Sequence, residues 1–201
     1  MKKESMEQKL ERIHTAAILL IENRDINKIS IYDISREAGI ASSTIYHHYP
    51  KVEAIFEHLM TTVFKDFDNV LHNAIIPSKV HNWPDINRMI ESAFIDFYRK
   101  NKLVQKLLLS QHIFTSIRHA DLENDTRLGV IVDSIYREYF DIPQQPPHIN
   151  IFTVSLQLAD RVYSLDYRKL GDISDEMAEE AIRATEAYLS LYLPHFIKNK
   201  N

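Results

Sequence analysis

The spacing of apolar and polar positions predicts helices along the whole chain. In residues 6–23, Leu10, Ile13, Ala17 and Leu20 recur at intervals of three or four residues, and charged side chains take the opposite face. This is the period of a helix that buries one side. The same pattern, interrupted by breaks, predicts about nine helices and an all-α fold, with helices over residues 6–23, 31–38, 42–49, 51–74, 84–97, 102–117, 122–140, 149–167 and 174–196.

A glycine separates the second and third of these helices. Ser30 precedes the apolar stripe of Ile31, Ile34 and Ala38, and a serine there caps a helix because its hydroxyl accepts a free backbone N–H. Gly39 follows the stripe and supplies the positive φ that a tight turn between helices needs. Three short helices with such a turn predict a helix-turn-helix, centred on Gly39.

The third helix has the side chains that a DNA-reading helix needs. Ile45 and Tyr49 lie four residues apart and are expected to anchor one face to the core. The other face must enter a major groove about 12 Å wide. Hydroxyl, phenol and imidazole groups, which can hydrogen-bond to phosphates and base edges, come from Ser42, Ser43, Thr44, Tyr46, His47 and His48.

The segment ISIYDISREAGIASSTIYHHYPKVEAIF resembles the DNA-binding signature of the TetR family of bacterial transcriptional repressors. The resemblance covers about residues 8–60, and the rest of the chain shares only the family's length and helical layout. The residues that match the family pattern are Ser30, Ile34-Ser35, Ala38-Gly39-Ile40, Thr44-Ile45-Tyr46, His48-Tyr49 and Glu53.

The resemblance implies a set of DNA contacts. It places Ser42, Ser43 and His47 against bases, and it assigns phosphate contacts to Ser30, Tyr32, Thr44, Tyr46 and His48. Two positions depart from the pattern. Ala41 stands where the family often has a capping Ser or Thr, with Ser42 as the candidate replacement. Val52 stands where the family has a lysine, and Lys51 is the candidate for that phosphate contact.

Charge and composition limit the kinds of binding site that the chain can have. The net charge is −4, yet residues 1–51 have eight Lys/Arg against seven Asp/Glu (+1), and residues 52–201 have sixteen against twenty-one (−5). The attraction between basic side chains and DNA phosphates acts within about 8–10 Å. An acidic segment 52–201 is therefore compatible with DNA binding by residues 1–51. Three glycines exclude a Gly-rich phosphate loop, and the absence of cysteine excludes disulfides and thiolate metal sites.

No metal site, cofactor, membrane span or secretory signal is expected. His47 and His48 are adjacent, so they do not share a helix face. No stretch reaches 18 consecutive apolar residues, and no apolar run follows the N-terminal charges. A cytoplasmic location is the expectation that follows.

Residues 1–50 are expected to form the DNA-binding domain and residues 51–201 a helical regulatory and dimerisation domain, as the resemblance implies. Helices 149–167 and 174–196 are the expected homodimer interface. A small-molecule effector of unknown identity would bind in an aromatic-lined cavity. The sequence shows no charged constellation there, which favours an apolar or amphipathic effector. The candidate ligand-binding residues are Phe94, Phe97, Tyr98, Phe114, Tyr136, Phe152 and Tyr163.

The sequence thus predicts a ligand-responsive repressor that binds a palindromic operator as a homodimer. An activator or an architectural DNA-binding protein is the alternative. The nearly neutral net charge of the N-terminal segment argues against non-specific coating of DNA, which relies on neutralising phosphates. A helical enzyme is disfavoured, because no catalytic spacing connects the candidate acids Asp96, Asp133, Glu138 and Asp160.

Overall fold

The computed structural model describes residues 4–110, 114–198 and 200, and these residues form helices and loops without a β-strand. The predicted all-α fold is confirmed. None of the described helices combines the length and apolar character needed to cross a bilayer. The helices are α1 (Met6–Asn23), α2 (Ile31–Ala38), α3 (Ser42–His48), α4 (Val52–Ala74), α5 (Trp83–Lys100), α6 (Lys102–Val104), α7 (Thr115–Tyr139), α8 (Ile151–Leu170) and α9 (Asp175–Leu189), with the short turns η1 (Ile26–Lys28) and η2 (Pro77–Lys79) and the π-helical turn η3 (Gln105–Leu109).

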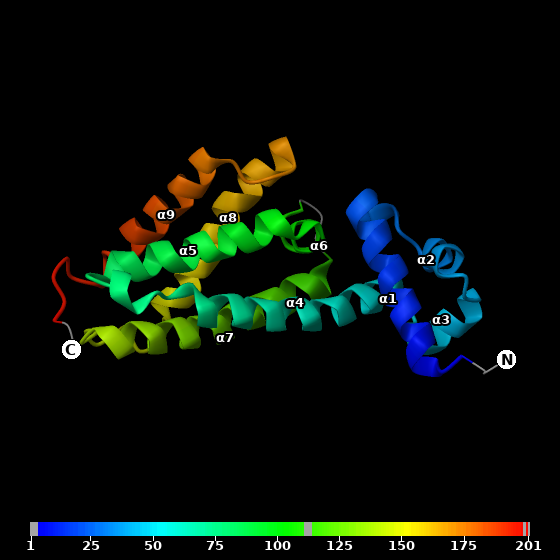
Figure 1. The fold of residues 1–201 in the computed structure, drawn as a ribbon, viewed down its shortest axis with the longest axis horizontal. Coiled ribbons are helices and arrows are strands. Elements are labelled where there is room, and N and C mark those ends of the chain that lie inside the picture. Colours follow the sequence, from blue (N-terminus) through cyan, green and yellow to red (C-terminus); the bar gives the residue numbers. More distant parts are fainter. Residues whose placement is uncertain (1–3, 111–113, 199, 201) are drawn as a thin grey trace.

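The helices form two groups connected by α4 (Figure 1). α1, α2 and α3 gather at one end of the molecule, and we call this group the reading head. α4 contacts α1 at that end and then packs on α5 and α7, while α8 lies against both α7 and α9. α4 therefore connects the reading head to the helices behind it, both through the continuous chain and through packing contacts.

One small core holds the reading head together. Ile13 of α1, Ile34 of α2, Ile45 of α3 and Ile55 of α4 are each fully buried, with no exposed surface. Burying an isoleucine stabilises a fold by about 1.5–3 kcal/mol relative to exposure. These contacts fix the position of α3, whose own seven residues are too few to be a stable helix alone.

The segment after α5 differs from the prediction of one helix over residues 102–117. α6 gives way to the π-helical turn η3, and the backbone leaves helical geometry at Ser110, with ψ 153°. The three consecutive leucines of this turn, Leu107, Leu108 and Leu109, are all buried. α7 begins at Thr115 and not at residue 122, and part of the predicted helix (residues 111–113) lies outside the described residues.

The last two helices also have other bounds than predicted. α8 begins after Asn150, whose side chain accepts from two backbone N–H groups, and it ends at Gly171 with φ +75°. α9 ends at Leu189, seven residues before the predicted end. Pro194 disfavours helical geometry in the residue before it, and its carbonyl oxygen accepts a hydrogen bond from the Trp83 indole.

Gly129 allows the close approach of α7 to α8, and we expect Gly129→Ala to destabilise the fold. A β-carbon there would lie 2.7 Å from the backbone nitrogen of Thr153 and 2.9 Å from its Cα. No side-chain rotation relieves a clash with backbone, so the helices must separate, at a cost of about 1–3 kcal/mol. This exceeds the gain in helix propensity of about 1 kcal/mol.

Urea unfolding of Gly129→Ala measures this cost. Val130→Ala, at the neighbouring and exposed position, is the matched control and should change stability little. A Gly129→Ala variant as stable as the wild type would show that α7 and α8 do not pack this closely.

Candidate nucleic-acid interface and effector recess

The turn between α2 and α3 has the geometry that the sequence predicts. Ser30 caps α2 in a capping box with Asp33, which accepts from the Ser30 backbone N–H at 3.0 Å. Gly39 has φ 62° and ψ 34°, the left-handed conformation, and ends the helix. The Arg12 guanidinium donates to the carbonyl oxygens of Ala38 and Gly39, so α1 holds the turn from behind.

α3 buries one face and exposes the other. Ile45 is fully buried, whereas the side chains of Ser43, Tyr46 and His47 are exposed. Ser43 and His47 are four residues apart and Tyr46 is one turn from Ser43, so all three share a face. Ser42 and Thr44 are half-buried on the flank. The exposed surface of α3 is thus free to meet a groove.

An aromatic pair extends this surface onto α2. The rings of Tyr32 and Tyr46 meet edge to face with centroids 6.2 Å apart, and their exposed fractions are 66% and 43%. Exposed large aromatic side chains with free hydroxyl groups suit a contact with a partner. Tyr46 is therefore a surface residue and not part of the core.

Three other residues with predicted phosphate contacts, Ser30, His48 and Lys51, are half-buried or interact with neighbouring residues of the protein. The Ser30 hydroxyl donates to Asp33 at 2.6 Å, so its hydrogen is engaged within the cap. His48 is half-buried, and its Nε2 has no hydrogen-bond partner among the described residues. Lys51 precedes α4, with its ammonium 3.9 Å from Glu57. α3 has no side-chain hydrogen bond at its N-cap, Ala41, and Ser42 is its first helical residue.

Tyr49 connects α3 to α1 and α4 at the base of the reading head. Its hydroxyl lies 2.7 Å from His14 Nε2, and the His14 ring stacks on His58 with centroids 4.3 Å apart. Burial and then the neighbouring His58 lower the pKa of His14 to about 4. His14 is therefore neutral near pH 7 and packs as a structural residue.

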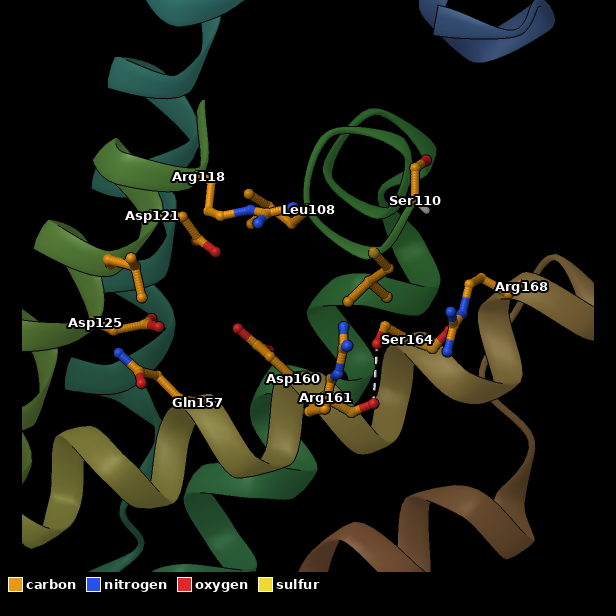
Figure 2. A pocket seen from close by; sticks show the side chains of 12 residues that line it. Leu108, Ser110, Arg118, Asp121, Asp125, Gln157, Asp160, Arg161, Ser164 and Arg168 are labelled. Carbon is orange, nitrogen blue, oxygen red and sulfur yellow. Dashed lines mark hydrogen bonds between the residues drawn. The ribbon is translucent and has the colours of Figure 1, made fainter. Parts of the chain in front are cut away.

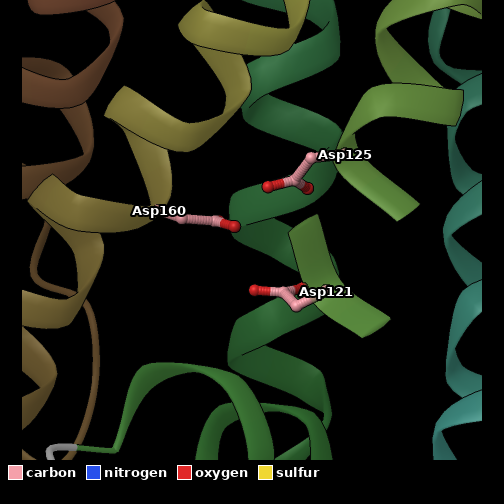
Figure 3. Close-up of side chains that lie close together, drawn as sticks. All are labelled: Asp121, Asp125 and Asp160. Carbon is pink, nitrogen blue, oxygen red and sulfur yellow. The ribbon is translucent and has the colours of Figure 1, made fainter. Parts of the chain in front are cut away.

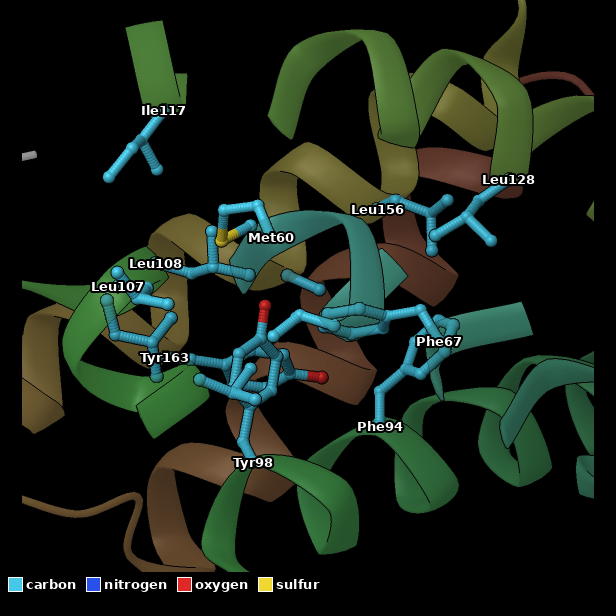
Figure 4. Close-up of a cluster of buried hydrophobic side chains, with 14 of the residues drawn as sticks. Met60, Phe67, Phe94, Tyr98, Leu107, Leu108, Ile117, Leu128, Leu156 and Tyr163 are labelled. Atoms are coloured by element: carbon cyan, nitrogen blue, oxygen red, sulfur yellow. The ribbon is translucent and has the colours of Figure 1, made fainter. Parts of the chain in front are cut away.

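The predicted aromatic residues pack into the hydrophobic core, where Figure 4 shows Phe94, Tyr98 and Tyr163 among its buried side chains. Phe94, Tyr98, Tyr136, Phe152 and Tyr163 are buried, and the remaining two, Phe97 and Phe114, are half-buried against the same core. The cavity that Phe94, Tyr98 and Tyr163 border has a volume of about 10 Å³, enough for one water molecule. These residues alone do not form a ligand-sized cavity in this conformation.

A larger recess lies beside them, between α7, α8 and the residues around η3 (Figure 2). Its volume is about 380 Å³, within the range of small-molecule sites. Asp121, Asp125 and Asp160 lie on its inner side, and we call them the acidic triad. Its other polar lining includes Gln157, Ser164, Arg118, Arg161 and Arg168.

The acidic triad brings three carboxyl groups together from two helices (Figure 3). One oxygen of each lies within 4.8 Å of the others. The Tyr98 hydroxyl donates to Asp160 at 2.9 Å, and the Tyr163 hydroxyl donates to the buried Glu91 nearby. The fold thus brings charged groups together beside the aromatic residues, which the sequence did not show, and the apolar or amphipathic character of the effector stays a prediction.

Burial raises the pKa of all three triad carboxyls and of Glu91. Desolvation is the largest cause of the raised pKa for all three triad carboxyls. The charge of Asp160 raises the pKa of Asp121 and Asp125 further. Desolvation also raises the pKa of Glu91 to about 8, against the opposing hydrogen bond from Tyr163. The site consequently holds protons, or attracts a cation, at a pH where exposed acids are ionised.

Comparison with known proteins identifies the reading head. Residues 13–59 match the family model of bacterial regulatory proteins of the tetR family. The nucleoid occlusion factor SlmA of Pasteurella multocida is 26% identical over 151 residues, which cover 71% of this chain and 69% of that protein.

Solved structures show the same fold over nearly the whole chain. A TetR-family transcriptional regulator from Streptomyces coelicolor superposes with a TM-score of 0.69 at 16% identity, covering 92% of this chain and 99% of that one. A regulator of the same family from Haloarcula marismortui gives a TM-score of 0.66 at 13% identity, covering 94% and 100%.

The exposed third helix, the glycine turn and the match to bacterial regulatory proteins define a DNA-binding transcription regulator of the helix-turn-helix class. The match over residues 13–59 confirms the resemblance to the tetR family that the sequence shows.

Proposed function

We propose that the protein is a ligand-responsive repressor that binds a palindromic operator as a homodimer. The observation that carries the proposal is the exposed face of α3, formed by Ser43, Tyr46 and His47, on a helix whose opposite side is locked by Ile45. Such a helix reads only a few base pairs. Two copies about one helical turn of DNA apart, roughly 34 Å, would read a palindrome and gain specificity.

The proposed dimer uses the outer faces of α8 and α9. Val154, Leu158, Val162 and Leu165 follow one another at helical spacing on α8 and are exposed or half-buried. Leu191, just beyond α9, is 74% exposed. An apolar stripe that the chain itself leaves uncovered, on two helices packed side by side, supports association of two copies through a two-fold axis.

Replacing Leu165 with glutamate is expected to convert the dimer to monomers. In a two-fold interface, the substitution places two like charges in one apolar contact, which costs several kcal/mol and weakens the dimer about 100-fold or more. Sedimentation velocity measures the change. Val130→Glu, on the exposed side of α7, should leave the dimer intact. A Leu165→Glu protein that stays dimeric would place the interface elsewhere.

A physical connection from the recess to the reading head supports ligand response. Leu108, Leu109 and Ser110 line the recess, and Lys106, one turn earlier, donates to the carbonyl oxygen of Arg24 at 2.9 Å. A ligand that moved this segment would therefore act on the end of α1. Binding shifts the affinity for DNA when the two conformations differ in ligand affinity.

Transcription from the promoter upstream of the protein's own gene tests the repressor proposal. A reporter under this promoter should be expressed less when the protein is present, and expression should return with the His47→Ala variant. Higher expression with the wild-type protein would make it an activator. Unchanged expression would contradict regulation at that promoter.

A second candidate follows from the relative named a nucleoid occlusion factor, which is 26% identical to this chain. In this alternative the protein would bind sites spread over the chromosome without regulating adjacent genes. Mapping of its binding sites in cells separates the two functions, because a repressor of the proposed kind would be concentrated at one or a few promoters.

A further inference from the structure

We propose that the acidic triad binds the cationic group of the effector, either a primary ammonium of a small organic amine or a divalent metal ion. The inference rests on the proposed function and names the chemistry of its ligand. Three observations carry it: the spacing of the triad, an unpartnered buried carboxyl, and a recess of ligand size beside them.

The spacing suits a small cation at the centre. For three oxygens at most 4.8 Å apart, there is always a point that lies within about 2.8 Å of every one of them. This is the distance of an N–H···O bond from an ammonium, which has three donors and no acceptor. A modest contraction reaches the 2.3–2.6 Å typical of calcium and its oxygen ligands.

The environment of Asp125 is a second observation, independent of the clustering of the three carboxyl groups. It is only 6% exposed, and among the described residues it has neither a hydrogen bond nor an ion pair. Its carboxyl group points toward Asp160, at the wall of the recess (Figure 3). Buried polar groups are normally paired, since an unpaired one costs about 1–3 kcal/mol. A ligand that donates to Asp125 would remove this cost.

Within the described part of the chain, no basic side chain neutralises the triad. Arg118, Arg161 and Arg168 line the same recess, but none lies within 4.0 Å of a triad carboxylate in the described structure. The Tyr98 hydroxyl is the protein donor to the triad, and it serves Asp160 alone. Asp121 and Asp125 face the recess without a donor among the described residues, so a positive group from outside fits there.

Further polar groups lie behind the triad, around two separate small cavities. Glu91 borders the small cavity behind the triad, and it also borders a second one next to Tyr136 and Ser155. The hydroxyl oxygens of Tyr136 and Ser155 are buried without a hydrogen-bond partner among the described residues. An organic amine with a second polar group could therefore extend inward from the triad once the side chains between them move.

Calorimetric titration of the full-length protein tests the proposal with three probes: putrescine for the amine class, and CaCl₂ and MnCl₂ for the metal class. We expect one class to bind, and Asp125→Asn to weaken its binding about 10- to 100-fold, the loss expected for one charged hydrogen bond. The substitution keeps the side-chain shape and removes repulsion, so the variant should fold. Glu123→Gln, exposed on the opposite side of α7, is the control and should bind as the wild type does.

The same probes, added to the complex with DNA, test whether the bound cation is an effector. The cation that binds should change the affinity for DNA in the wild type and leave the Asp125→Asn complex unchanged. No binding by any probe, or equal binding by Asp125→Asn, would overturn the proposed site. Binding without any change in affinity for DNA would overturn its role as the effector site. Failure to form a DNA complex at all would instead contradict the proposed function, and the two failures are thus distinct.

Discussion

His47→Ala is expected to weaken operator binding about 10- to 100-fold while leaving the fold intact. The His47 side chain is exposed on the same face of α3 as Ser43, so its removal empties no core position. A lost contact with a base edge costs about 1–3 kcal/mol and relaxes the sequence preference at that base pair. Fluorescence anisotropy with operator and scrambled DNA measures both effects.

The matched control removes another exposed imidazole far from DNA. His72 lies in the last turn of α4, and His72→Ala should bind operator as tightly as the wild type does. If His47→Ala kept full affinity and full sequence preference, the exposed face of α3 would not be the surface that reads bases.

The stability of the protein is expected to fall as the pH rises from about 4.5 to about 8, and Glu91→Gln should reduce this dependence. The pKa of Glu91 is about 8 in the folded protein and near 4.5 when exposed. Between these values the folded chain keeps a proton that the unfolded chain has lost. Each such group therefore lowers the free energy of unfolding by up to about 1.4 kcal/mol per pH unit as pH rises.

Across the whole window, Glu91 alone would account for roughly 5 kcal/mol, and the triad carboxyls act in the same direction. Glutamine keeps the hydrogen bond with Tyr163 and removes the titration. Urea unfolding at several pH values measures the slope, with exposed Glu138→Gln as the control. A wild-type protein whose stability rises over this window, or a Glu91→Gln protein with an unchanged slope, would contradict the assignment.

The reading head could be predicted from the sequence because its determinants are local. The cap at Ser30, the left-handed turn at Gly39 and the buried Ile45 all lie within about one helix-turn-helix unit, and each is recognisable from its neighbours. The individual DNA contacts remain predictions. At three of them the structure adds what sequence spacing does not show: a hydrogen bond at Ser30, burial at His48 and an ion pair at Lys51.

The recess could not be predicted, because its residues meet only through the tertiary fold. Asp121 and Asp125 are four residues apart on α7, whose start was predicted wrongly at residue 122. Asp160 lies on a different helix, α8. In sequence, each is an ordinary helix acid of the kind that is usually solvated. The break at Ser110 could not be predicted either, since no glycine or proline marks it.

The most direct test of the central claim is a footprint combined with a gel-shift titration on the DNA upstream of the protein's own gene. We expect two protected half-sites related by a two-fold axis, with centres about 34 Å or a multiple apart, and a complex whose affinity falls as salt rises. A complex that forms equally on unrelated DNA, or no salt-sensitive complex at all, would contradict the claim that α3 reads an operator.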